Sequence, residues 1–226
     1  AHPAWSHASL GDFYADRFFM PLGLLYVTLL YGAIDRQGNN FTRNYLLLTL
    51  AIGLLDASAT ERVSIMIALF TIASLVLYRK RIADRNSIVI LAVFSLALLT
   101  HVFLYVKFLY VHHVGTGSLS SILQGIPAFF EQIKAPAYAA KVQEFIVINV
   151  LLFGLFALFD WRLALIAFAA LLPNLFTNIG GAEKIGWGTH YHSMYFPFLV
   201  FASAIGVSKL WAYLGAAKYR LILIMA

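Results

Sequence analysis

The sequence of 226 residues contains no cysteine and little charge, and both shortages exclude large classes of protein. Without cysteine there is neither a disulfide framework nor a thiolate metal site. Charged residues make up 12% of the chain and hydrophobic residues 62%, with a mean hydropathy of +0.82. Water-soluble domains of this length do not have such a composition. The sequence therefore predicts an integral membrane protein.

A recognisable leader is also missing. The chain begins with Ala1 and shows no basic segment followed by a short apolar one, so no signal peptide is predicted. The last residues, KYRLILIMA, read as the first turns of another membrane span. We therefore expect that this chain is a fragment of a longer polypeptide.

Seven apolar segments approach the length of roughly 20 residues that a membrane-spanning helix needs. They are continuously apolar and do not alternate as strands of a membrane barrel do. The second segment is short and carries Asp56, so we interpret it as a tilted or re-entrant element. We predict an all-α, polytopic transmembrane bundle of six to seven spans, forming a single domain over 1–226 with an outer loop at 112–144. The segments are 18–34, 45–59, 63–78, 87–111, 145–159, 163–179 and 194–214.

Basic residues are unevenly distributed between the two predicted sides of the membrane. If 79–85 lies inside, alternation of the spans places ten of the 16 basic residues there, with only three of the ten acidic ones. Because cytoplasmic loops retain Lys and Arg, this asymmetry predicts a multi-pass protein with 79–85 in the cytoplasm. The segments 112–144 and 180–192 then lie outside. The net charge of +6 reflects this topology, and nucleic acid is not a predicted partner.

Histidines and acidic residues gather on the predicted outer side. Six of the seven histidines fall there, in loops that are far apart in the sequence. A site assembled from loops at one end of a bundle is common in membrane enzymes and transporters. A plainer explanation is that outer loops are polar in any case and that Trp, Tyr and His favour headgroup depth. Both explanations stay open at the level of the sequence.

Four short motifs occur in an order that resembles a known family. They are DFYADRFFMPL, LLDASATER, LLPNLFTNIGG and THYHSMYFPFLVFASAIGVSKL. In this order they resemble the bacterial and archaeal predicted membrane proteins grouped as domain of unknown function 2079, which are similar to the GT-C class of polytopic glycosyltransferases. The chain apparently lacks the N-terminal part of that family, where GT-C enzymes keep a catalytic acid. The most specific matches are Pro173, Asn174, His190, Tyr191, Pro197, Gly206 and Lys209.

The resemblance implies transfer of a sugar from a polyprenyl-phosphate donor at the outer face of a bacterial or archaeal cytoplasmic membrane. Such a reaction needs a carboxylate that accepts the proton of the acceptor hydroxyl, and cations or donors that hold the departing phosphate. Asp56 is the strongest candidate, because a carboxylate in an apolar span is costly to bury unless it is paired. Its partner would be Arg62 or Arg17, and a purely structural ion pair is the alternative. The candidate catalytic residues are Asp56, Glu61, Asp12 and Asp16, and the candidate substrate-binding residues are Arg17, Arg62, Lys184, His190, Tyr191 and His192.

Other classes of site and function are less well indicated. His190 and His192 would share one side only in an extended segment, and the chain has no HExxH motif, so no cofactor is expected and a divalent metal is only weakly indicated. A transporter would need polar residues at mid-membrane and broken helices. A non-catalytic structural subunit of a larger membrane assembly is the main alternative to the enzyme. The predicted partners are membrane lipids, a polyprenyl-phosphate sugar and other membrane subunits.

Overall fold

The computed structural model describes residues 18–35, 41–82, 85–105, 127–176 and 190–225. Every regular element in these ranges is a helix, which confirms the all-α prediction for the described part of the chain. The α-helices are α2 (Phe19–Asp35), α3 (Phe41–Ala57), α4 (Glu61–Leu77), α5 (Arg85–Tyr105), α8 (Pro136–Ile146), α9 (Trp161–Phe176) and α10 (Phe196–Met225).

Four shorter helical elements connect or extend these helices. A 3-10 turn, η2 (Arg79–Arg81), follows α4, and a second one, η7 (His190–Met194), precedes α10. A π-helix, η4 (Val147–Phe153), continues α8, and Gly154 separates it from the 3-10 helix η5 (Leu155–Phe159). π-helical turns are rare and often occur at functional sites.

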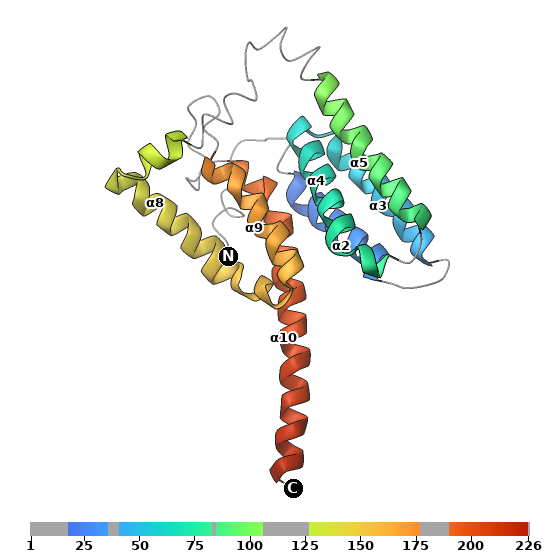
Figure 1. Ribbon diagram of the computed structural model, residues 1–226, viewed down its shortest axis with the longest axis vertical. Helices are drawn as coiled ribbons and strands as arrows, with labels where there is room; N and C mark the ends of the chain where they lie inside the picture. Colours follow the sequence, from blue (N-terminus) through green and yellow to red (C-terminus); the bar gives the residue numbers. More distant parts are fainter. Residues whose placement is uncertain (1–17, 36–40, 83–84, 106–126, 177–189, 226) are drawn as a thin grey trace.

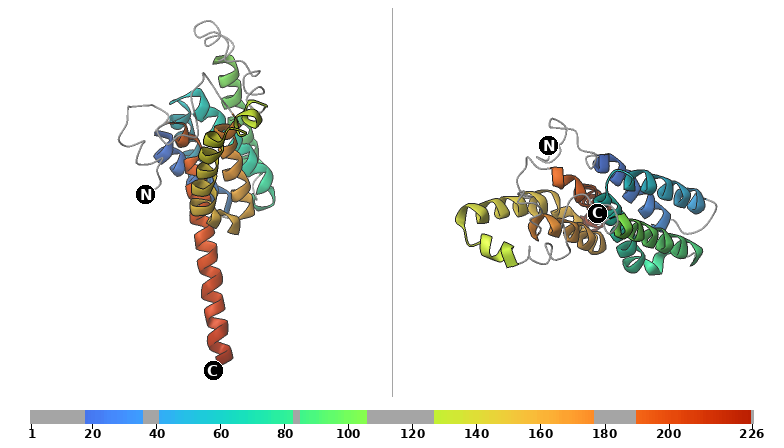
Figure 2. Two further views of the ribbon diagram at one scale, coloured as in Figure 1. Left: turned by 90° about the vertical axis from the view of Figure 1, so that its left-hand side faces the viewer. Right: turned by 90° about the horizontal axis from the view of Figure 1, so that it is seen from above.

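The helices form two groups with α10 between them (Figures 1 and 2). In one group α2 packs on α3, and α4 packs on both α3 and α5. The other group contains α8, η4, η5 and α9. The first half of α10 contacts α2, α9 and η5, whereas its second half projects beyond the bundle (Figure 1). The core is therefore assembled around the first turns of α10.

Three helical segments are long and apolar enough to cross a membrane: Arg85–Leu104, Pro136–Phe153 and Phe196–Gly215. The other four apolar helices have only 16 or 17 residues. The structure thus places a helix at each of the seven predicted segments. By length and composition, however, only three of these helices in the described residues qualify as spans.

Two boundaries differ from the prediction. Within the predicted outer loop 112–144, residues 127–132 are helical, as expected for the segment IPAFFEQI, but α8 already begins at Pro136, before the predicted end of the loop. Pro136 occupies the first turn of α8, where its missing N–H costs nothing, and Val142 and Phe145 give the helix a buried side. The predicted span 145–159 is consequently not one element: helix α8 and its π-helical continuation run from 136 to 153, and the chain then turns at Gly154.

Glycine permits the closest approach in the bundle. A Cβ atom placed on Gly206 of α10 would lie 1.7 Å from the carbonyl oxygen of Phe156 in η5, so only glycine fits there. Small residues allow helices to pack backbone against backbone in this way. Ser203, one turn earlier on α10, donates a hydrogen bond to the carbonyl oxygen of Phe153. Together these contacts fix the position of α10 along its axis relative to η5.

Candidate functional site

A tight turn between α3 and α4 positions Asp56. Thr60 caps α4, its hydroxyl accepting a hydrogen bond from the Val63 N–H at 3.3 Å. The Ser64 hydroxyl donates to the carbonyl oxygen of Ala57 at 2.9 Å and so ties the first turn of α4 to the last turn of α3. Asp56 lies in that last turn and is fully buried.

The Asp56 carboxylate has no hydrogen-bond partner among the described residues. Both of its oxygens are buried and unpaired. A polar hydroxyl pair lies near it: Asp56 is within electrostatic range of the Tyr26 hydroxyl, which hydrogen-bonds the Thr71 hydroxyl at 2.5 Å. Because the Thr71 hydroxyl donates to the Ile67 carbonyl at 2.7 Å, it accepts from Tyr26, and neither hydroxyl donates to the carboxylate. Buried polar groups in proteins are nearly always hydrogen-bonded, so this exception requires an explanation.

A second polar cluster lies where η7 packs against α2, α4 and α9. His192 is buried, and its Nδ1 atom lies 2.8 Å from the hydroxyl of Tyr195. Phe145 of α8 packs against both rings. Asn149, in the π-helix, is also buried and donates to the carbonyl oxygen of Phe145 at 2.9 Å. The cluster therefore joins η7 to α8, with the rings of His192 and Tyr195 packed against Phe145.

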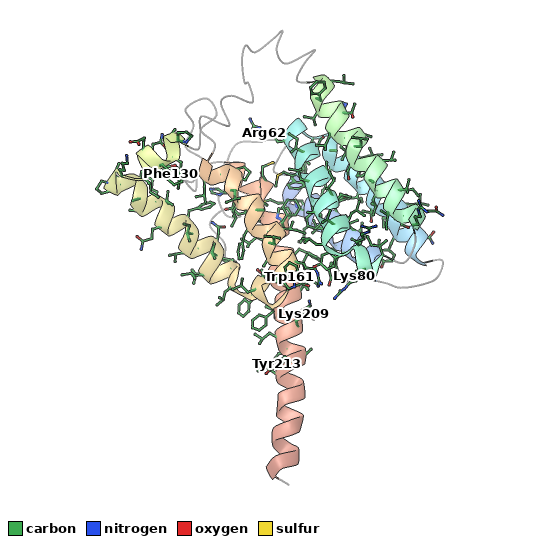
Figure 3. The ribbon with its side chains drawn as sticks, in the orientation of Figure 1. Arg62, Lys80, Phe130, Trp161, Lys209 and Tyr213 are labelled. Carbon is green, nitrogen blue, oxygen red and sulfur yellow. The ribbon has the colours of Figure 1, made fainter. Side chains whose placement is uncertain are left out.

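We define the Asp56 end as the C-terminus of α3, the N-terminus of α4 and η7. Six of the ten predicted site residues belong to it: Asp56, Glu61, Arg62, His190, Tyr191 and His192. Arg62 is half-buried at the start of α4 (Figure 3). The structure describes the side chains of Asp56, Arg62 and His192, but not those of the other three. The remaining four, Asp12, Asp16, Arg17 and Lys184, lie outside the described residues.

The expected ion pair between Asp56 and Arg62 is not formed. No hydrogen bond reaches either carboxylate oxygen from Arg62 or from any other described residue. The reason is the turn itself: Asp56 faces the core beside Tyr26, whereas Arg62 is the second residue of the next helix, beyond the Thr60 cap. The described residues also contain no group of three or more His, Asp or Glu side chains placed to hold a metal ion.

The opposite end of the bundle contains a polar cluster that sequence reasoning missed. Asp160 precedes α9, and its Oδ1 atom accepts hydrogen bonds from the Tyr78 hydroxyl at 3.1 Å and from the N–H groups of Arg162 and Leu163 at 3.2 and 3.4 Å. Its Oδ2 atom accepts a hydrogen bond from the Lys209 ammonium at 2.5 Å. We call this the Asp160 end. An aspartate directly before a helix is an N-cap signal, which could have indicated Asp160 but not its distant partners.

Charge and hydrogen bonding at the Asp160 end favour an ionised carboxylate. Burial alone would raise the pKa of Asp160, but the Lys209 ammonium, the Leu163 N–H and the Tyr78 hydroxyl hold this pKa below its ordinary value. The Tyr78 hydroxyl is the donor in its hydrogen bond with Asp160. This cluster therefore joins α4, α9 and α10 through a fully satisfied charge.

Comparison of the chain with protein-family models, with curated proteins and with solved structures finds no match. The resemblance drawn from the four motifs stays a prediction. What bears on function is therefore the geometry of the Asp56 end and of the Asp160 end.

Proposed function

We propose that this chain is a multi-pass membrane protein in which the four shorter apolar helices also lie within the bilayer, giving six to seven membrane segments. Their exposed sides support this. On α3 and α4, five apolar side chains expose more than half of their surface. They are Leu47, Leu54, Leu55, Leu69 and Val76. So many exposed apolar side chains are unfavourable in water and are expected against lipid.

We infer the orientation of the bundle in the membrane from the positions of its basic side chains. Arg79, Lys80, Arg81, Arg162 and Lys209 all come from the elements that meet at the Asp160 end. By the excess of Lys and Arg on cytoplasmic sides, the Asp160 end is proposed to face the cytoplasm. The Asp56 end then faces the outer side of a bacterial or archaeal cytoplasmic membrane.

At the Asp56 end we propose a GT-C-like site that binds a polyprenyl-phosphate sugar and transfers the sugar. The observation that carries this proposal is the buried Asp56 carboxylate with neither oxygen paired. An unpaired ionisable group inside a membrane bundle is costly and is usually kept for function. It would accept the proton of the acceptor hydroxyl while the hydroxyl oxygen bonds to the anomeric carbon of the sugar. The bond from that carbon to the phosphate oxygen breaks, and polyprenyl phosphate leaves.

The test is transfer from a polyprenyl-phosphate sugar by the purified protein in lipid nanodiscs. Asp56→Asn keeps the shape of the side chain but cannot accept the proton, so we expect turnover to fall by roughly 10²- to 10⁴-fold with little change in donor binding. Ser58→Ala, in the exposed turn two residues later, is the matched control and should retain activity. Full activity in Asp56→Asn that inserts and folds normally would contradict the catalytic role.

A second candidate function is a structural subunit of a larger membrane assembly, and one feature of α10 favours it. Beyond Lys209 the helix projects from the bundle and carries Tyr213 (Figure 3). Tyr213 is 71% and Trp211 78% exposed. Aromatic side chains are frequent at the centres of protein interfaces. If this is the function, the native complex should dissociate when Trp211→Ala and Tyr213→Ala are combined, while Asp56→Asn leaves it intact. Size-exclusion chromatography of the complex solubilised from its native membrane distinguishes the two candidates.

A further inference from the structure

Three buried polar side chains form a chain of hydrogen bonds to which the proposed transfer reaction assigns no role. They are Asn149, Tyr195 and His192. The Asn149 side chain hydrogen-bonds the Tyr195 hydroxyl, and this hydroxyl lies 2.8 Å from Nδ1 of His192. The chain therefore runs from the π-helix η4 to η7, which is one of the elements of the Asp56 end.

The donor and the acceptor of each bond in this chain follow from the number of protons available. The Nδ2 atom of Asn149 carries two protons, and it donates one of them to the carbonyl oxygen of Phe145 at 2.9 Å. The Tyr195 oxygen accepts the other. The phenol has one proton of its own to donate, and Nδ1 of His192 is the acceptor that lies within reach of it. Nδ1 therefore accepts a hydrogen bond and carries no proton.

An imidazole that accepts at Nδ1 is neutral and carries its proton on Nε2. The ring of His192 is also held by aromatic contacts. Its centroid lies 5.9 Å from that of Phe145 and 5.7 Å from that of Tyr195, whose ring it meets edge-on. Phe145 packs edge-on against Tyr195 as well, at a centroid separation of 5.8 Å. Both the tautomer and the orientation of His192 are therefore set by its neighbours.

Asn149 is the one polar residue of η4, whose sequence is VINVLLF. A buried amide in an apolar helix is costly unless its protons find acceptors, whereas an apolar side chain at this position would have no such requirement. The π-helical conformation is rare and often occurs at functional sites. The amide and the conformation together indicate that this turn of the helix serves the chain of hydrogen bonds.

The position of His192 indicates what its Nε2–H group would meet. Nε2 lies on a different edge of the ring from Nδ1, so it points away from Tyr195. The element that carries His192, η7, packs against α2, α4 and α9. The proposed reaction releases a phosphate at this end of the bundle, and pre-organised N–H donors stabilise the charge that develops on such a leaving group.

We propose that Asn149 and Tyr195 are positioning residues that hold His192 as the neutral Nε2–H tautomer, and that this N–H donates to the phosphate of the polyprenyl-phosphate sugar. The inference rests on the transfer function proposed for the Asp56 end. His192 is then a hydrogen-bond donor and not a base, and Asp56 is the group that takes the proton of the acceptor hydroxyl.

The first test is ¹⁵N NMR of the histidine-labelled protein in nanodiscs, which reports the ring nitrogen that carries the proton. The His192 signals are identified by their loss in His192→Gln, and wild type should show the proton on Nε2 alone. Tyr195→Phe removes the donor to Nδ1, and Asn149→Leu leaves the phenol free to accept from His192, so both variants should populate the second tautomer as well. Tyr213→Phe, which removes an exposed hydroxyl from α10, is the matched control and should resemble wild type.

The NMR outcome does not depend on turnover. A proton on Nδ1 in wild type would overturn the assignment of the tautomer. Unchanged tautomers in folded Tyr195→Phe and Asn149→Leu would show that these two residues do not position His192, and would overturn the proposal equally.

The second test asks which ring nitrogen binds phosphate. Glutamine places its amide nitrogen close to the position of Nε2, and asparagine places its own close to the position of Nδ1. His192→Asn should therefore weaken binding of polyprenyl phosphate about tenfold, the loss of one hydrogen bond to a charged acceptor, whereas His192→Gln should weaken it far less. Equal affinities of the two variants would overturn the donor role. Because polyprenyl phosphate carries no sugar, normal binding without sugar transfer would count against the proposed reaction alone.

Discussion

Asp56 and Asp160 are both buried aspartates at helix ends, one at each end of the bundle, but their surroundings differ. The Asp160 oxygens accept hydrogen bonds from an ammonium, a hydroxyl and two backbone N–H groups. The Asp56 oxygens accept none from the described residues. A satisfied buried charge can hold elements together, whereas an unpaired one costs folding free energy and needs another reason to be present. We infer that the Asp160 carboxylate has a structural role and that Asp56 is kept for a function.

The largest effect is expected from a substitution that prevents α10 from packing closely on η5, because this packing brings Lys209 to Asp160. Gly206 lies one turn before Lys209, and a Cβ there would collide with the Phe156 carbonyl. Gly206→Ala should therefore lower the free energy of unfolding by about 3 kcal/mol, or prevent α10 from docking. Gly215→Ala is the matched control, since a Cβ at that position meets nothing within 4 Å. Thermal unfolding in detergent measures both, and equal stability of the two variants would contradict the packing described for α10.

Low pH should also lower the stability of the folded protein, through Asp160, but by less than Gly206→Ala does. Burial acts against ionisation, but Lys209 and the other donors keep the pKa of Asp160 below its ordinary value of 3.8 in the folded protein. The unfolded chain therefore takes up the proton first as the pH falls. The stabilisation is complete above about pH 5 and is lost progressively below pH 4. Melting temperatures of wild type and Asp160→Asn, measured from pH 7 to pH 3, should converge in acid; parallel curves would show that Asp160 is not the titrating group.

The sequence was sufficient for the helices and for much of the Asp56 end. Continuous apolar runs predicted a helix at each of the seven segments, and the LLDASATER motif indicated a helix end with a buried acid. The lengths of the helices were harder to predict, because tertiary packing and not hydropathy decides where a helix such as α8 begins. Its continuation as a π-helix carries no hydropathy signal.

The Asp160 cluster could not be predicted, because its partners are separated by 82 residues for Tyr78 and 49 residues for Lys209. The predicted topology counts ten basic and three acidic residues on the inner side of the membrane, but does not show which of them touch. Nor does it show that Gly206 brings Asp160 and Lys209 together. These contacts depend on how closely α10 approaches η5, which a single sequence does not reveal.

The most direct test of the difference between the two ends is the stability of two isosteric variants at pH 7, measured side by side. Asp160→Asn removes the negative charge that pairs with the Lys209 ammonium. It should lower the free energy of unfolding by about 2 kcal/mol. Asp56→Asn replaces a buried carboxyl group that has no hydrogen-bond partner among the described residues, and should leave stability unchanged or raise it by about 1 kcal/mol. A comparable loss of stability in both variants would show that Asp56 is also a structural partner, and would contradict the account.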